Sequence, residues 1–531
     1  MTKKNNLIFL TALLLYSLYC TLQLGYTWDV IFHYELGKDR LDYLFSLGSN
    51  EINESVTVRK FYTGAYSTIS AFFVQFFPKE YNLEALYIFN LIFSTLSIFG
   101  IYKITRTLFN KQIGQITFIL CFFNPIYFGH MAMNGSDTII SFAYIWFFYT
   151  ILRYITYQEV KKKRNNYVII SGLLLGLGLG VRYSFFITLT PIFLFFLLEI
   201  FYFKILVNEK FSKKVFFIDS IKVLILAYLF MVLFWPQTHA NIFLLPFKLA
   251  IESVHFGFGV PFILFNEGIY LTGQLPKSYI LINLFYKMPE FIVLSFIIFF
   301  CFFFKIGSYL KKEIKGFYPK FFLVLIIILF PNLLLLVMPW GIYDGIRLFL
   351  YLIPFICIIP SILIFFLFKM IKNNLYKFTF LSLVFLQIFS LFNFFSLTPY
   401  HYVYLNIFAG KYSENSKKFE NDYWGVSTKK LISYINSHDE MFKNSKVKIA
   451  TCGLEVKAQK NYLKKLKNFE FKIVDKDENF DFIIMNNRAF WDKKDKTYNP
   501  NKAQTCFKKY SGKDLIKVQR RGLIISKITK I

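Results

Sequence analysis

Two acidic residues and a histidine stand beside the apolar segments of this sequence, in positions where ionisable side chains are rare. Asp29 comes directly after the first apolar segment, and His33 follows it by one helical turn. Asp137 stands at the start of another apolar segment. An ionisable group beside a membrane is costly unless it faces water, a partner or a substrate. Asp29 and Asp137 are therefore candidate general bases, which take a proton from an attacking hydroxyl group.

Basic side chains in similar positions are candidates for binding an anion. Asp344 precedes Arg347 at the expected start of an apolar helix, where free backbone N–H groups and the helix dipole favour a phosphate. Arg182 lies between two apolar segments, where an arginine costs at least ~2.5 kcal/mol unless it reaches water or an anion. Lys277 is a weaker candidate, because a lysine in a loop is usually solvated. The candidate substrate-binding residues are His33, Arg182, Lys277, Asp344 and Arg347.

Each candidate also has a purely structural explanation. Asp29 and Asp137 could cap helices, and His33 could be a packed, hydrogen-bonded residue. Asp344 could pair with Arg347 only to cap the helix that follows. The position of Asp29 directly after an apolar segment, with His33 one turn away, favours a functional role for this pair.

The composition excludes an ordinary soluble globular protein. The chain has 531 residues, of which 56% are hydrophobic, and its mean hydropathy is +0.46. A formal net charge of +29 would suggest nucleic-acid binding in a soluble protein, but no basic and aromatic surface motif accompanies the lysines. Much of the positive charge lies in short stretches between apolar segments, where it sets membrane orientation. We expect an integral membrane protein without a nucleic-acid partner.

Apolar segments that fit membrane helices recur along the first 396 residues. A helix needs ~20 apolar residues to cross the hydrocarbon core of a bilayer. No small-residue cleavage site follows the first segment, which we interpret as an uncleaved signal anchor. The eleven expected spans are 6–25, 84–105, 111–129, 137–157, 166–182, 184–206, 215–235, 290–308, 320–339, 347–369 and 375–396.

Positive charge in alternate connections predicts the orientation of these spans. The connection Lys161-Lys162-Lys163-Arg164 and others like it are cytoplasmic by the positive-inside rule, which places the acidic candidates on the outer side. Outer loops are then expected at 26–83 and 236–289, with an interfacial or re-entrant helix in Phe61–Phe77. With eleven spans, the residues from about 397 onward are also outside.

The sequence pattern changes near residue 400, where short strands replace long apolar helices. We predict a membrane domain in 1–396 and a small, outward-facing soluble α/β domain in 397–531. The expected strands are Val447–Cys452, Phe469–Val474 and Phe480–Met485, and the expected helical pieces are Lys429–Ser437 and Leu463–Leu466.

Two of the six cysteines, Cys452 and Cys506, lie in this C-terminal segment. The other four lie in or beside apolar segments, where cysteine behaves as a small hydrophobic residue. No cysteine spacing matches a metal-binding motif. The sequence leaves open whether Cys452 and Cys506 form a disulfide or stay free, because it does not show that they approach each other.

A series of short motifs follows a fixed order along roughly residues 1–430. The first is Trp28-Asp29-Val30-Ile31-Phe32-His33-Tyr34. The others are Arg59–Pro78, Asn124-Pro125 through Asn134-Gly135-Ser136-Asp137, Trp235-Pro236, Leu275-Pro276-Lys277-Ser278-Tyr279, Lys287-Met288-Pro289, Tyr343–Tyr351, Pro399–Asn406 and Asp422-Tyr423-Trp424-Gly425. In this order they resemble the motifs of GT-C membrane glycosyltransferases, in the branch of protein O-mannosyltransferases and aminoarabinose transferases.

The resemblance implies a multi-pass α-helical membrane enzyme that transfers a sugar from a polyprenyl-phosphate carrier to an acceptor at the outer face, with inversion. Asp29 would take the proton of the acceptor hydroxyl as it attacks C1. Arg347 and Arg182 would stabilise the charge that grows on the leaving lipid phosphate. The expected location is a bacterial inner (plasma) membrane. Whether the acceptor is a protein, a lipid or a glycan is not determined, nor is the sugar.

One departure from the family's pattern changes these expectations. The family usually shows an Asp-Glu pair at the first motif, and Val30 replaces the second acid here. Asp29 is then the sole candidate base of that motif, and Asp137 gains interest. The departure also weakens the case for a carboxylate-bound divalent metal, which some relatives carry and others do not need.

A rival class is a membrane transporter or a flippase of lipid-linked saccharides, which also needs polar groups facing a cavity. No internal repeat and no pair of broken helices in matching positions is evident in the sequence. The long outer loops also suit an enzyme better. The predicted fold is therefore a GT-C-like membrane protein of about 11 transmembrane helices with a small C-terminal soluble α/β domain.

Overall fold

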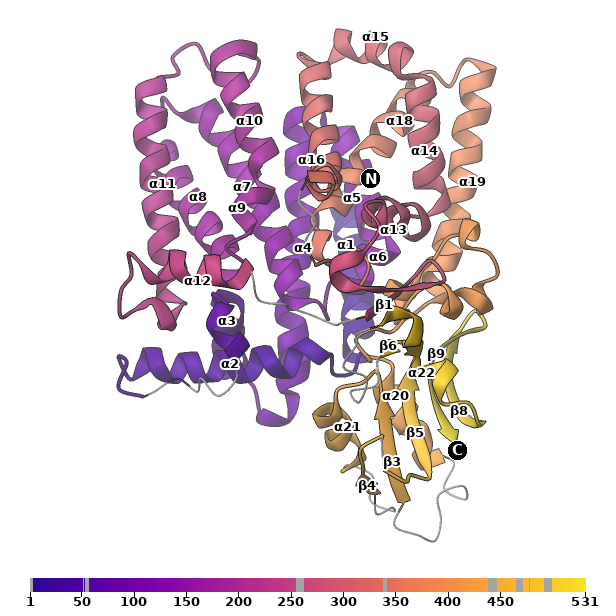
Figure 1. Ribbon diagram of the computed structural model, residues 1–531. Helices are drawn as coiled ribbons and strands as arrows, with labels where there is room; N and C mark the ends of the chain where they lie inside the picture. Colours follow the sequence, from indigo (N-terminus) through magenta and orange to yellow (C-terminus); the bar gives the residue numbers. More distant parts are fainter. Residues whose placement is uncertain are drawn as a thin grey trace.

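The computed structural model describes residues 3–50, 52, 57–254, 262–337, 341–437, 447–464, 471–476, 478–490 and 499–531. Long helices form a bundle, and a β-sheet lies at one end of it (Figure 1). The main bundle helices are α1 (Lys3–Leu22), α4 (Asn82–Leu108), α5 (Lys111–Phe122), α7 (Gly135–Tyr157), α8 (Lys161–Val181), α10 (Thr190–Leu198), α11 (Lys213–Leu233), α14 (Glu290–Cys301), α15 (Phe303–Glu313), α16 (Phe317–Val337), α18 (Ile358–Lys369) and α19 (Asn374–Ser396).

The remaining helices of this part are mostly short and lie between the long ones. One of them carries Asp29 and His33. They are α2 (Trp28–Phe45), α3 (Ala65–Val74), α6 (Pro125–His130), α9 (Phe185–Thr188), α12 (Leu245–Val254), α13 (Tyr279–Lys287) and α17 (Leu352–Ile356).

Six helical segments among the described residues are long and apolar enough to cross a bilayer. A seventh crossing arises if α13 and α14, which meet at a bend of 112°, are counted as one broken span. The protein is an integral membrane protein. The six segments are Lys79–Leu108, Gly135–Tyr157, Lys213–Leu233, Phe317–Val337, Leu352–Lys369 and Asn374–Ser396.

The expected count of eleven spans is not confirmed. Helix α5 has 12 residues, which at 1.5 Å per residue reach about 18 Å, short of a hydrocarbon core of ~30 Å. Helix α8 begins with four consecutive basic residues, so its first turn is charged rather than apolar. Between 184 and 206 the chain forms two short helices and a π-helical turn instead of one continuous helix. These segments remain predicted spans.

Helix α2 lies across the end of the bundle nearest the sheet (Figure 1). Helix α3 packs closely on it: a Cβ atom on Gly37 would lie 2.0 Å from the Ser67 carbonyl oxygen and 2.8 Å from the Ala71 Cβ atom. The helix expected in Phe61–Phe77 is therefore present as the shorter α3, and its small residues face a glycine. This close packing fixes α2, whose first two turns carry Asp29 and His33.

The C-terminal segment contains a five-stranded sheet with the order β4-β3-β5-β9-β8. Strands β4, β3 and β5 run parallel, whereas β9 pairs antiparallel with both β5 and β8. Two small antiparallel pairs accompany it, and β1 contacts β6. The strands are β1 (Phe262–Phe265), β2 (Gly268–Leu271), β3 (Val447–Cys452), β4 (Phe471–Ile473), β5 (Phe482–Asn486), β6 (Ala489–Phe490), β7 (Gln504–Thr505), β8 (Lys513–Arg520) and β9 (Leu523–Lys530).

The three expected strands are present as β3, β4 and β5, although the first two residues of Phe469–Val474 lie outside the described part of the chain. Buried aliphatic residues of β3 and β5 gave the signal in the sequence. The chain between and before them forms α20 (Thr428–Ser433) and α21 (Val456–Leu463), and α22 (Cys506–Lys509) follows β7. Of the expected piece Leu463–Leu466, the last two residues lie outside the described part of the chain. Strands β8 and β9 were not predicted, and the boundary at 397 stays a prediction.

Cys452, at the end of β3, forms a disulfide with Cys506, at the start of α22, and their Cα atoms lie 5.8 Å apart. The bridge joins the parallel part of the sheet to the chain that leads into β8. It settles the alternative that the sequence left open.

The sheet region contacts the chain directly in front of α2. The Gly25 amide donates to the Val426 carbonyl oxygen at 2.9 Å, and the Trp28 indole donates to the Gly453 carbonyl oxygen at 3.2 Å. The Tyr26 amide also donates to the Tyr462 hydroxyl at 2.7 Å. These bonds attach the residues beside Asp29 to the C-terminal part of the protein.

Candidate active site

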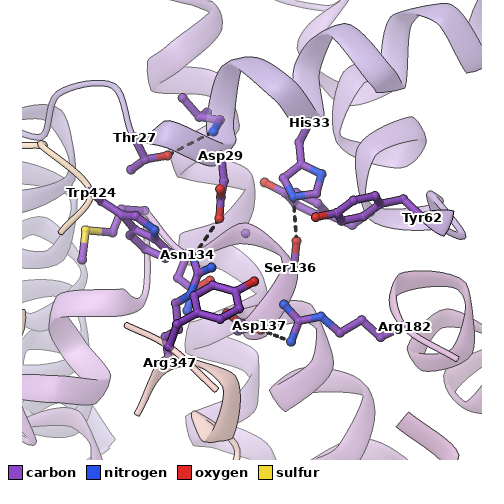
Figure 2. A pocket seen from close by; sticks show the side chains of 15 residues that line it. Thr27, Asp29, His33, Tyr62, Asn134, Ser136, Asp137, Arg182, Arg347 and Trp424 are labelled. Atoms are coloured by element: carbon purple, nitrogen blue, oxygen red, sulfur yellow. Dashed lines mark hydrogen bonds and ion pairs between the residues drawn. The ribbon is translucent and has the colours of Figure 1, made fainter. Parts of the chain in front are cut away.

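A cavity of about 40 Å³ lies between the start of α2, the start of α7 and the segment around Arg347 (Figure 2). Its lining comes from segments far apart in the sequence, and most of its side chains are polar or aromatic. The lining residues are Thr27, Asp29, Val30, His33, Tyr62, Tyr66, Met133, Asn134, Gly135, Ser136, Asp137, Arg182, Tyr343, Arg347 and Trp424.

Asp29 occupies the first turn of α2, and its side chain is 46% exposed. Thr27 caps this helix, because its hydroxyl oxygen accepts a hydrogen bond from the Val30 amide at 3.1 Å. Asp29 is therefore free of the capping role, and its carboxylate points into the cavity (Figure 2). There it accepts a hydrogen bond of 2.8 Å from Nη1 of Arg347.

Arg347 lies between two carboxylates and two aromatic rings. Besides Asp29, it contacts Asp344, whose Oδ2 is 3.4 Å from Nε of Arg347. The rings of Tyr343 and Trp424 lie 4.8 and 4.9 Å from the guanidinium carbon. A buried arginine fixed by charge and by ring contacts is preorganised to meet an anion that enters the cavity.

The helix start expected near Arg347 is absent. Arg347–Phe349 form a single 3₁₀ turn, and α17 and α18 begin only after it. Pro354 and Pro360 lack the backbone N–H that a regular helix needs, which accounts for the broken start. The expected phosphate seat at a helix N-terminus is therefore wrong, and the side chain of Arg347 is what faces the cavity.

The second candidate carboxylate, Asp137, forms an ion pair with Arg182 at 2.7 Å. The Asp137 side chain is buried, whereas the Arg182 side chain is about one-third exposed. Gly135 precedes them at the start of α7, and a Cβ atom there would lie 1.8 Å from the Tyr66 hydroxyl oxygen. The cavity thus holds two aspartate–arginine pairs, one on each side (Figure 2).

His33 is buried between two serines. Its Nδ1 lies 2.8 Å from Ser67 Oγ and its Nε2 lies 3.0 Å from Ser136 Oγ. Burial lowers the pKa of His33 to about 4, so the imidazole is neutral at pH 7. His33 holds α2 against α3 and the start of α7, and it is not a cation for an anionic ligand.

Opposing effects act on the pKa of Asp29. Burial of the site disfavours the charged carboxylate, but the positive charge of Arg347 and its hydrogen bond to Asp29 outweigh this effect. The pKa of Asp29 therefore lies below its usual range, and the carboxylate is ionised at neutral pH.

The two remaining candidates, Asp344 and Lys277, differ in their position relative to the cavity. Asp344 forms an ion pair with Arg347 through Nε, whereas Asp29 accepts a hydrogen bond from Nη1. Lys277 is exposed and donates to the Leu336 carbonyl oxygen at 3.3 Å, so the structure does not bring it to the cavity.

One charged neighbour of the site was missed from the sequence. Arg488 follows strand β5 and donates from Nη2 to Oδ1 of Asp344 at 3.1 Å. It lies among polar residues of the predicted soluble segment, where a single arginine gives no signal of a buried role. Tyr62 and Trp424, which also line the cavity, fell within the recognised motifs but were not singled out.

The donor set does not fit a divalent metal. Both cavity carboxylates are engaged by arginines, and the described part of the chain has no group of three or more His, Cys, Asp or Glu side chains that could hold a metal ion. Ligation needs several oxygen or nitrogen donors converging on one point. The side chains of the cavity therefore offer acid–base and anion-binding groups rather than a set of metal ligands.

Comparison with known proteins gives one family match. Residues 65–236, which contain Asp137 and Arg182, match the model of the dolichyl-phosphate-mannose-protein mannosyltransferase family. No curated protein matches the chain.

The structures of ArnT share the fold along almost the whole chain. ArnT from Cupriavidus metallidurans in the apo state is 8% identical, with a TM-score of 0.51 over 99% of this chain and 98% of that one. ArnT bound to undecaprenyl phosphate is also 8% identical, with a TM-score of 0.50 over 100% and 98%. The Archaeoglobus fulgidus oligosaccharyltransferase is 10% identical, with a TM-score of 0.48 over 90% and 69%. The family match and the ArnT fold confirm the predicted resemblance to GT-C membrane glycosyltransferases.

Proposed function

We propose that this protein transfers a sugar from a polyprenyl-phosphate carrier to an acceptor at the outer face of the membrane, with inversion and with Asp29 as the general base. The observation that carries the proposal is the pair of Asp29 and Arg347 at one cavity. A base and an anion stabiliser are the two groups that this reaction requires.

The two arginines of the cavity suit the phosphate of the donor. Arg347 and Arg182 are each paired with a carboxylate, and an entering phosphate would compete for their N–H groups. When the phosphate takes Arg347, the Asp29 carboxylate is released from its partner and can accept a proton. The binding of undecaprenyl phosphate by ArnT, which has the same fold, supports this choice of donor.

An apolar groove beside the cavity suits the lipid tail. Its volume is about 300 Å³, and it shares Tyr62, Arg182 and Tyr343 with the cavity. The rest of its lining includes Phe185, Leu348, Phe349 and Tyr351. A lipid whose phosphate meets Arg182 would thus extend its first isoprene units along an aromatic wall.

The reaction is a single displacement. The acceptor hydroxyl attacks C1 of the sugar, Asp29 takes its proton, and the bond between C1 and the phosphate oxygen breaks. The electron pair leaves with the lipid phosphate, whose added negative charge is stabilised by Arg347 and Arg182. One displacement inverts C1. The phosphate leaves without protonation, so no general acid is required.

Asp137 is the alternative base, but it is the more buried of the two carboxylates.

Two observations support an outward orientation in a bacterial inner membrane. Basic connections such as Lys161-Lys162-Lys163-Arg164 lie at the end of the bundle away from the cavity. The disulfide between Cys452 and Cys506 suits an oxidising compartment outside the cytoplasm. A membrane domain in 1–396 would then carry the chemistry, and an outward-facing α/β domain in 397–531 would cover it.

Reconstitution tests the proposal. The full-length protein in vesicles, supplied with a polyprenyl-phosphate sugar and an acceptor extract, should form new glycoconjugate, and the Asp29→Asn variant should not. Passage of intact lipid-linked sugar across the bilayer without glycoconjugate would instead support a transporter or flippase. A membrane-impermeant reagent should label a tag at the C-terminus and leave a tag in 157–166 protected. The opposite labelling would overturn the outward orientation.

A further inference from the structure

The C-terminal segment places an arginine directly behind the cavity. Arg488 lies between β5 and β6, close to where β1 and β6 meet at the junction with the helices (Figure 1). It is 6% exposed, although it belongs to the segment predicted to be a soluble domain. Its Nη2 donates to Oδ1 of Asp344 at 3.1 Å, and its Nη1 donates to the Tyr423 carbonyl oxygen.

The backbone around Arg488 is also fixed by hydrogen bonds. The Asn486 side chain accepts a hydrogen bond from the Arg488 amide at 3.1 Å. The same Asn486 donates to the carbonyl oxygens of Asp422 and Gly453 at 2.6 and 2.9 Å. These bonds attach Arg488 to the segment that delivers Trp424 to the cavity, so its position relative to the site is fixed.

Asp344 connects this arginine to the cavity. One of its oxygens faces Arg488 and the other faces Arg347, which in turn bonds Asp29. Asp344 itself cannot shift easily. Its φ of +56° lies in the left-handed region, and the amide of the next residue, Gly345, donates to the Tyr279 hydroxyl at 2.8 Å. Four charged side chains thus form a continuous chain from the C-terminal segment to the candidate base.

The charges in this chain balance only if Arg488 is present. Asp29 and Asp344 contribute two negative charges, and Arg347 and Arg488 contribute two positive ones. Without Arg488, Arg347 would be the one cation left among these four side chains, and the four would carry one net negative charge. The buried Lys287 and Glu420 also act on Asp344, with opposite signs. Negative charge beside the cavity repels an entering anion, and it draws the Arg347 guanidinium back toward Asp344.

We propose that Arg488 is a positioning residue of the active site, which neutralises Asp344 and thereby leaves Arg347 free to serve Asp29 and an anion in the cavity. The C-terminal segment would then be part of the site and more than a cover for it. The identity of the anion as a lipid phosphate rests on the proposed function, whereas the effect of Arg488 on Asp29 does not.

The test uses the full-length protein in detergent and the variant Arg488→Gln. Native mass spectrometry with undecaprenyl phosphate measures anion binding, which we expect to weaken by about 10- to 100-fold because Arg347 is displaced. Infrared difference spectra between pH values, with Asp29→Asn as the reference, report protonation of the Asp29 carboxyl without any substrate. In Arg488→Gln the pKa of Asp29 should rise, because the positive charge of Arg488 is lost and because Arg347 is then shared with an unneutralised Asp344.

Arg520→Gln is the matched control. Arg520 also joins the C-terminal sheet to the rest of the protein, with Nε donating to the Thr398 carbonyl oxygen at 2.7 Å, but it is not part of the charge chain. It should leave both measurements at their wild-type values. If Arg488→Gln binds undecaprenyl phosphate as Arg520→Gln does, and the pKa of Asp29 is the same in both variants, the proposal is overturned.

Two further outcomes are decisive. If Arg488→Gln does not fold, Arg488→Met takes its place, because a flexible, unbranched apolar side chain suits a buried position and removes the charge. Wild-type binding and Asp29 titration in that variant would overturn the proposal. If the wild-type protein binds no undecaprenyl phosphate, the proposed donor is wrong, and the infrared titration alone then decides the role of Arg488.

Discussion

Nη1 of Arg347 lies 2.8 Å from Oδ2 of Asp29, although 318 positions separate the two residues in the chain. The contact joins the first turn of α2 to the segment that leads into α17. It places a carboxylate and a guanidinium at one cavity, where the guanidinium lowers the pKa of the carboxylate.

The first prediction concerns Asp29 as the base. Asp29→Asn keeps the size of the side chain but cannot accept the proton, so turnover should fall by about 10²- to 10⁴-fold. Binding of undecaprenyl phosphate should persist, because Arg347 loses a competing carboxylate. Asp42→Asn, an exposed position on the same helix, is the control and should retain full transfer. Normal transfer by Asp29→Asn together with loss of transfer by Asp137→Asn would identify Asp137 as the base.

The second concerns Arg347. Arg347→Ala should weaken donor binding and lower turnover together, because the guanidinium meets the phosphate in both the ground state and the transition state. Steady-state kinetics in vesicles separates the two effects. Arg521→Ala serves as the control, because Arg521 lies in the turn between β8 and β9 and contacts the Tyr412 ring rather than the cavity. A loss of turnover with unchanged donor binding would show that Arg347 acts only on the transition state.

The third concerns pH. The base must be ionised, and the pKa of Asp29 lies below its usual range because Arg347 is adjacent. Transfer should therefore stay constant from neutral pH downward and fall only as the pH drops below ~3.9, the ordinary pKa of aspartate. His33, with a pKa of about 4, gives no transition near pH 6.5. A pH profile of kcat/KM that loses activity between pH 6 and 7 would assign the base to another group.

The fourth concerns the apolar groove beside the cavity. Leu348→Trp should fill part of it, and KM for a long-chain polyprenyl-phosphate sugar should rise while a short-chain analogue is affected little. Leu224→Trp is the matched control, since Leu224 lines a separate apolar cavity that shares no residue with the site. Equal effects of Leu348→Trp on long and short donors would place the lipid tail elsewhere.

Several features could be predicted because they depend on neighbouring residues. Hydropathy over ~20 residues identifies membrane helices such as α7 and α19, and buried aliphatic runs identify β3 and β5. Asp29 and His33 share a helix face because they are four positions apart. The order of the motifs also indicated the GT-C resemblance, which the family match and the fold confirm.

Helix lengths and local breaks were predicted less well from the sequence. The sequence predicted one span over 347–369, but a 3₁₀ turn precedes α17 and α18. Strands β8 and β9 escaped prediction because charged residues alternate with the aliphatic ones in β8 and because Lys527 interrupts the aliphatic run of β9. In these cases tertiary packing outweighs the local preference on which the prediction rests.

The sequence by itself determined a membrane protein with a set of ionisable residues at its helix ends, Asp29, Asp137, Arg182 and Arg347 among them. Only the tertiary structure decided that Asp29 meets Arg347, that Asp137 meets Arg182, that Lys277 lies outside the cavity, and that Arg488 stands behind Asp344. The physical reason is that hydropathy and periodicity act within a few turns of chain, whereas these charge pairs join segments that only the packing of helices and sheet brings together.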